Sequence, residues 1–307
     1  MAAMQKNTLK YSALVFAGGA SYGIMATTVK FALNDGFSWT QIAASQPLFG
    51  TLLFAAALLV LILRGKRPVR LSPKRIASLL ALGLTTCTTC VLYNFALTKL
   101  PVAVAITLLF QFTWIGVVIQ IIVTRRRPQP AELAAAAIIL GGTLLASGLF
   151  SEALDQVDPL GVVCGLLSAV STALFMFLSG RIGVDLPPIQ RGLFVCLGAC
   201  ILGFIACPTY FASGALQAGI WKYGLVLGAF GLLIPVILFG IGTPHLPTGL
   251  STIMASSELP CGILVSVLIL GEPIDVLQTI GIVVILAGVV VSQLPNLLPP
   301  KLPDSTT

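Results

Sequence analysis

The stretch STIMASSELPCGILVSVLIL (251–270) decides the fold class of this chain. It is long and apolar enough to cross the hydrocarbon core of a bilayer as a helix, which takes about 20 residues. It also places a carboxyl group, Glu258, and a helix-breaking residue, Pro260, in the middle of that run. Ionisable groups in hydrocarbon are costly and usually mark pathways. The segment therefore indicates a membrane protein and a candidate site together.

The rest of the chain has the same character. Of its 307 residues, 57% are hydrophobic and 9% are charged, whereas a soluble globular domain has about 25% charged residues. The charges cluster and leave apolar runs of spanning length, without the short alternating segments of a β-barrel. These features predict an all-α polytopic membrane protein that forms a single membrane domain over residues 1–307.

Ten transmembrane helices are expected, joined by short connections that leave no soluble domain. The expected spans cover about residues 11–33, 39–63, 76–98, 101–123, 132–150, 159–179, 191–212, 220–243, 247–270 and 274–295.

The orientation follows from the 17 Lys and Arg residues, because cytoplasmic loops retain positive charge. Most of them lie in RGKRPVRLSPKR (64–75), in TRRRPQP (124–130), around the sixth connection at Arg181 and Arg191, and at the termini. The opposite connections, SEALDQVD (151–158) and GEPID (271–275), are acidic. We expect a multi-pass plasma (inner) membrane protein with both termini cytoplasmic. The net charge of +7 then reflects topology and attraction to a lipid bilayer, and nucleic acid is not an expected partner.

An internal repeat is indicated by LPVAVAITLLFQFTWIG (100–116) and LPTGLSTIMASSELPCG (246–262), which align without a gap at an offset of 146. The first segment runs inward in the expected topology and the second runs outward. Matching segments with opposite direction predict an inverted five-plus-five repeat, with repeat one at 11–150 and repeat two at 159–295, around a central cavity.

Polar residues near mid-span are the candidate substrate-binding groups, because such groups face a bundle interior or a cavity. A single Ser or Thr more often packs against a neighbouring helix, so larger groups carry more weight. Glu258 has two open interpretations: it contacts a substrate ammonium or carries an exchangeable proton, or it stays protonated and bonds a neighbouring helix. Pro260 lacks an N–H and is the expected hinge. The candidate residues are Tyr22, Asn94, Gln111, Trp114, Ser257 and Glu258.

No catalytic, metal or cofactor site is indicated. The seven cysteines all lie in apolar runs, and the CxxC spacing of Cys87 and Cys90 lacks a basic flank. His245 is the one histidine and cannot form a metal site alone. Phosphate-loop and zinc-protease motifs are missing, so ATP hydrolysis and an intramembrane enzyme are disfavoured.

The segments YNFALTKLPVAVAITLL (93–109) and SELPCGILVSVLILGEPIDVLQTIGIVVILAGV (257–289) resemble EamA-type permeases of the drug/metabolite transporter superfamily. The resemblance covers nearly the whole chain. It implies ten helices, an inverted repeat, a central cavity and, most often, export.

The expected function is a secondary transporter that exports or exchanges small organic metabolites, with amino acids as the nearest guess and protons as a possible coupling ion. Cationic drugs or sugar nucleotides are the alternatives, although mid-span positions without Lys or Arg favour neutral, zwitterionic or cationic substrates. A sensor would normally need a soluble domain. The sequence leaves the oligomeric state open.

Overall fold

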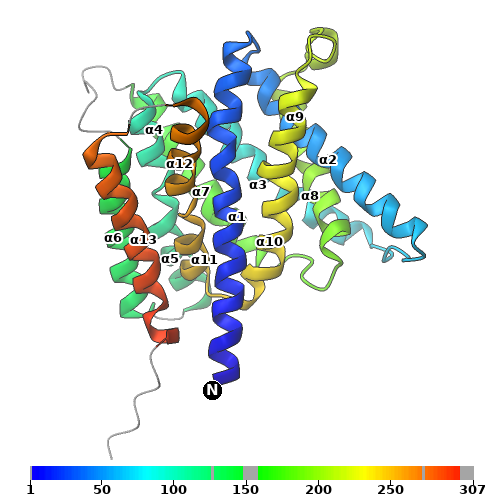
Figure 1. Cartoon of the computed structure of the whole chain (residues 1–307). Helices are drawn as coiled ribbons and strands as arrows, with labels where there is room; N and C mark the ends of the chain where they lie inside the picture. Colours follow the sequence, from blue (N-terminus) through cyan, green and yellow to red (C-terminus); the bar gives the residue numbers. More distant parts are fainter. Residues whose placement is uncertain (1, 126–127, 148–157, 272–273, 298–307) are drawn as a thin grey trace, which may run out of the picture.

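The computed structural model describes residues 2–125, 128–147, 158–271 and 274–297, and within these ranges all regular elements are helices (Figure 1). Two short 3-10 turns, Tyr210–Ala212 and Thr243–His245, accompany them. The remaining helices are α1 (Ala2–Asn34), α2 (Trp39–Leu63), α3 (Pro73–Leu97), α4 (Val102–Leu109), α5 (Phe112–Thr124), α6 (Pro130–Ala146), α7 (Pro159–Ser179), α8 (Pro188–Ala206), α9 (Trp221–Gly228), the π-helical turn η3 (Ala229–Leu233), α10 (Ile234–Gly242), α11 (Thr248–Ala255), α12 (Glu258–Leu270) and α13 (Val276–Leu297).

The predicted polytopic helical architecture is confirmed. In the described ranges, nine helical segments are long and apolar enough to cross a membrane, and the 17-residue α6 is a shorter apolar helix. Each predicted span corresponds to one helix or to consecutive pieces of one: α4 with α5, α9 through α10, and α11 with α12. The acidic connections used for orientation lie largely at 151–157 and 272–273, outside the described residues.

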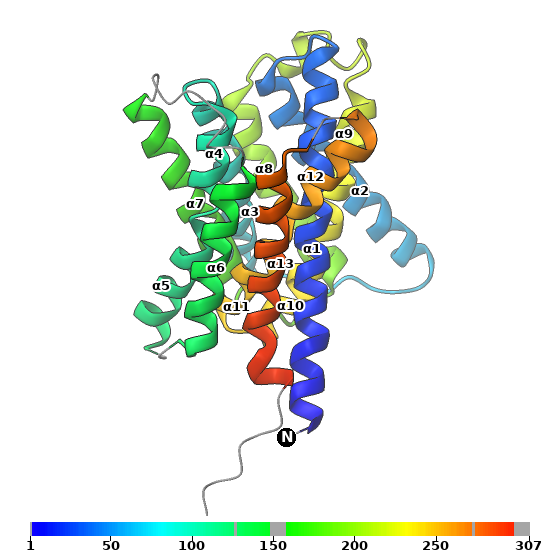
Figure 2. The same ribbon diagram turned by 60° about the vertical axis from the view of Figure 1, so that its left-hand side comes forward.

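The N-terminal end of α1 and the C-terminal end of α13 lie at the same end of the bundle, called here the terminal end (Figures 1 and 2). This agrees with termini on one side of the membrane, and their cytoplasmic location stays a prediction. Arg191 lies at the start of the seventh predicted span, beside the sixth connection as expected, but its side chain is buried. It lies in the first turn of α8, is 2% exposed, and donates to the carbonyl oxygens of Ser179 and Ile182 at 2.7 and 3.0 Å. It closes the C-terminal end of α7 instead of facing water.

The fourth and ninth predicted spans are broken at corresponding residues. The break between α4 and α5 is at Phe110 and Gln111, and the break between α11 and α12 is at Ser256 and Ser257, an offset of 146. Gln111 and Ser257 have the same backbone angles, φ −58° and ψ −17°. This coincidence supports the sequence repeat; its inverted arrangement stays a prediction.

Helices α6 and α13 pack side by side through small residues (Figure 2). A Cβ placed on Gly142 would lie 2.8 Å from Ile285 Cγ1, and one placed on Gly288 would lie 2.7 Å from Ile139 Cγ1. The two contacts are reciprocal, because these four residues are the pairs related by the 146 offset. Only glycine allows this approach at both places.

Candidate functional site

Glu258 is the first residue of α12 and therefore lies directly at the second helix break. Its side chain is half-buried, and no hydrogen bond or ion pair joins its carboxyl group to a residue that the structure describes. Among the described residues, a second carboxyl group buried in a span, that of Glu132, is 4% exposed and accepts a hydrogen bond from the backbone N–H of Gln129 in a capping box. Glu132 thus has a structural role, whereas the carboxyl group of Glu258 is available to a ligand.

Two tyrosines from other helices interact electrostatically with this carboxyl group. The phenol groups of Tyr22 on α1 and Tyr93 on α3 are both within electrostatic range of Glu258. The ring of Tyr22 also lies 5.9 Å from that of Phe239 on α10, centroid to centroid. Tyr22 was a predicted site residue and Tyr93 was not, although Tyr93 stands beside Asn94 in the polar stretch TTCTTCVLYN (85–94).

Asn94 lies one residue further along α3 and is half-buried. Its amide nitrogen donates to the carbonyl oxygen of Cys90 at 2.9 Å and lies 3.2 Å from the Cys90 Sγ atom. Ser257 is fully buried, and its hydroxyl donates to the carbonyl oxygen of Phe16 on α1 at 2.7 Å. Ser257 therefore joins the helix break to α1, and its hydroxyl is already used.

Gln111 and Trp114 lie together at the first helix break. The indole N–H of Trp114 donates to Gln111 Oε1 at 2.7 Å, and Gln111 Nε2 donates to the carbonyl oxygen of Thr107 at 3.0 Å. The Trp114 side chain is 40% exposed and presents its ring at mid-span. Among the described residues, no hydrogen bond joins this pair to Glu258, so Gln111 and Trp114 lie at one break and Ser257 and Glu258 at the other, whereas Tyr22 and Asn94 lie on α1 and α3.

The two halves of the broken spans are packed differently at the two ends of the bundle. At the terminal end, α5 packs against α11, whereas in the described residues their counterparts α4 and α12 share little contact. The Thr113 and Ser256 hydroxyls lie 3.1 Å apart, the Thr252 hydroxyl donates to the carbonyl oxygen of Thr113, and the backbone N–H of Gly249 donates to Gln120 Oε1 at 2.8 Å. These contacts join α5 to α11 at the terminal end, which is therefore called the sealed terminal end below. These interhelical contacts were missed, because a sequence does not show which polar residues face each other.

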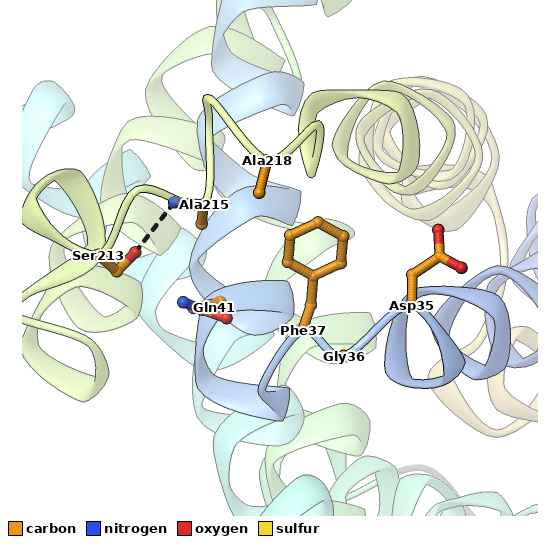
Figure 3. Close-up of a pocket in the computed structure, with 7 residues that line it drawn as sticks. All are labelled: Asp35, Gly36, Phe37, Gln41, Ser213, Ala215 and Ala218. Atoms are coloured by element: carbon orange, nitrogen blue, oxygen red, sulfur yellow. Dashed lines mark hydrogen bonds between the residues drawn. The ribbon is translucent and has the colours of Figure 1, made fainter.

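The described residues were also considered for a metal site and for a second pocket. Within them, no three His, Cys, Asp or Glu side chains are grouped as metal ligands. A separate pocket of about 360 Å³ lies between the α1–α2 connection and the segment before α9 (Figure 3). None of the predicted site residues lines this pocket. Its lining residues are Asp35, Gly36, Phe37, Gln41, Ser213, Ala215 and Ala218.

Comparison with known proteins gives the family. The sequence model of the EamA-like transporter family matches residues 9–148 and residues 159–293. The chain belongs to the EamA-like transporter family. The resemblance to EamA-type permeases is thereby confirmed. In this family member, the helix breaks and the Glu258 carboxyl group, which is unpaired among the described residues, are the features from which a function can be argued.

Individual relatives agree with this membership. An "Uncharacterized transporter" from Archaeoglobus fulgidus is 31% identical over 132 residues, which are 43% of this chain and 47% of that protein. The chain therefore matches about half the length of this relative. A solved crystal structure shares the fold, with a TM-score of 0.77 at 19% identity over 94% of this chain and 97% of that chain.

Proposed function

We propose that this EamA-family chain is a secondary transporter that exports or exchanges small organic metabolites, in particular amino acids, across the plasma membrane by alternating access. The observation that carries the proposal is the Glu258 carboxyl group, which is unpaired among the described residues, lies at a mid-span helix break and has Tyr22 and Tyr93 within electrostatic range. Discontinuous helices of this kind form the substrate sites of many secondary transporters.

The substrate class follows from the charges and rings near the breaks. A carboxyl group binds an ammonium group, and an aromatic face attracts a cation. Among the described residues the buried cation is Arg191, which is held by backbone carbonyl oxygens at the end of its span. This favours amino acids or cationic drugs over sugar nucleotides, which would need several cations around their phosphates.

The packing difference between the two ends supports alternating access. With α5 and α11 in contact and α4 and α12 apart, the substrate would reach the breaks from the end opposite the termini. If the termini are cytoplasmic, as we propose, this conformation faces outward. Glu258 would then bind the substrate ammonium group or a proton in exchange, which couples substrate movement to the proton gradient.

The test is Glu258→Gln in proteoliposomes, with amino-acid flux measured across a range of pH. The variant keeps shape and hydrogen bonding but cannot ionise, so we expect lower flux or a lost pH dependence at unchanged protein abundance. Glu132→Gln is the matched control, because glutamine also completes a capping box. Normal flux of Glu258→Gln at every pH, or an equal loss in both variants, would contradict the proposal.

A further inference from the structure

A basic segment between α2 and α3 is a feature that the transport proposal does not use. Residues 64–75 hold six cationic side chains, all of them exposed. Arg75 forms an ion pair with Asp185 at 2.9 Å, and no ion pair joins the other five to a residue within the described ranges. These five are Arg64, Lys66, Arg67, Arg70 and Lys74.

The segment is held in place by hydrogen bonds. Gln190, 4% exposed in the first turn of α8, accepts from the backbone N–H of Val69 at 2.9 Å and donates to the Val69 carbonyl oxygen at 2.7 Å. At its start, Gly65 takes φ +81° and Lys66 N–H donates to the Leu61 carbonyl oxygen at 3.0 Å, which ends α2 in a Schellman motif. A fixed backbone lowers the entropic cost of binding a ligand through the flanking cations.

The apolar surface next to this segment faces away from the bundle. The C-terminal half of α2 diverges from the other helices (Figures 1 and 2). Its last turns expose Leu59, Ile62 and Leu63 at 56%, 43% and 78%. The same surface thus offers an apolar helix face that continues directly into a cationic loop.

We infer that residues 64–70 and the last turns of α2 form a binding site for an anionic phospholipid, with the headgroup phosphate at Arg67 and Arg70 and the acyl chains along α2. The apolar face distinguishes a lipid from a free anion, which would need the cations alone. A second copy of this chain would bring the same positive loop, and like charges would oppose that contact.

The experiment measures binding of fluorescent phosphatidylglycerol to the full-length protein in neutral detergent, with phosphatidylcholine as the uncharged comparison. The test variant is Arg67→Gln with Arg70→Gln. The matched control is Lys10→Gln with Arg125→Gln, which removes two exposed cations elsewhere in the chain. One cation near an anionic lipid surface changes affinity about fivefold, so the test variant should bind phosphatidylglycerol about 30-fold more weakly. The control should bind like the unmodified protein.

A third variant, Gln190→Leu, keeps every cation and removes both hydrogen bonds to Val69. A loss of affinity supports a fixed site, and unchanged affinity overturns it. Equal losses in the two double variants, equal binding of both lipids, or displacement by an equal concentration of inorganic phosphate would each overturn the inference. Unfolding temperatures of all variants in neutral detergent check that they are folded.

Discussion

Gly116→Ala is expected to open the sealed terminal end. A Cβ at Gly116 would lie 2.6 Å from Thr252 Oγ1 and 3.0 Å from Thr252 Cβ on the facing helix. Thr252 is fixed there, because its hydroxyl donates to the carbonyl oxygen of Thr113. The residue related by the 146 offset is Gly262, where a Cβ would meet nothing closer than 3.5 Å. The same substitution therefore meets a tight contact in one half and an ordinary van der Waals contact, with Gly23, in the other.

The size of the effect follows from the packing. Adding one methyl group to a close-packed contact costs about 1–3 kcal/mol. The helix propensity gained on replacing Gly by Ala applies in both conformations and cancels. The ratio of sealed to unsealed protein should therefore fall about 5- to 150-fold. Under alternating access, Ile106 would pack against Gly262 in the opposite conformation, so Gly262→Ala should shift the ratio toward the sealed form.

Disulfide trapping provides the assay. A Cβ at Gly249 would lie 3.5 Å from Val117 Cα, which is close enough for Val117→Cys and Gly249→Cys to form a disulfide with Cβ atoms about 3.5–4.5 Å apart. The rate of oxidative cross-linking then reports the sealed fraction. Adding Gly116→Ala to this pair should slow cross-linking, and adding Gly262→Ala should not. If both additions slow it equally, α5 and α11 do not separate as a gate.

Three further predictions concern the site and the topology. Trp114→Ala should lower flux at least fivefold at unchanged abundance, whereas Val290→Ala, on an exposed face of α13, should leave flux unchanged; equal losses would remove Trp114 from the substrate path. Pro260→Ala should change flux less than about twofold, since its missing N–H falls in the first turn of α12, and a large loss would show that proline itself is needed. Single cysteines at Asn34 and Ser213 should react with membrane-impermeant reagents added outside, and protection of both would reverse the proposed orientation.

The helical architecture could be predicted because each span is long, apolar and bounded by charges or prolines, all of which are local properties. The contacts between spans could not. Glu258 and Tyr22 were recognised as unusual groups in hydrocarbon, but the electrostatic interaction of Tyr93 with Glu258 depends on where α3 lies relative to α12. Ser257 looked like a ligand-binding hydroxyl, and the structure uses it to bond Phe16. Arg191 was expected at the edge of a connection, and tertiary packing buries its side chain against the end of α7.

The cause of the helix breaks also could not be predicted from the sequence alone. The sequence attributed the second break to Pro260, which removes the N–H that would bond the Ser256 carbonyl oxygen. The first break has the same backbone angles, yet the residue related to Pro260 by the offset is Trp114. Proline is therefore not required for this geometry.

Both breaks share hydrogen bonds that replace the regular helical pattern. The backbone N–H groups of Gln111 and Ser257 donate to the carbonyl oxygens of Leu108 and Met254, three residues back, at 3.2 and 3.3 Å. The side chain of Gln111 also donates a hydrogen bond to the carbonyl oxygen of Thr107, and the side chain of Ser257 donates one to the carbonyl oxygen of Phe16.

The second break also explains the position of Glu258. It starts a new helix inside the span, so the carboxyl group lies at the N-terminal end of α12, where the helix dipole favours negative charge. Burial in the bundle opposes that charge. With the two effects opposed and no partner for the carboxyl group among the described residues, a proton or an ammonium ligand can bind there without first displacing a hydrogen bond or ion pair from another described residue. This is the property that the proposed exchange at Glu258 needs.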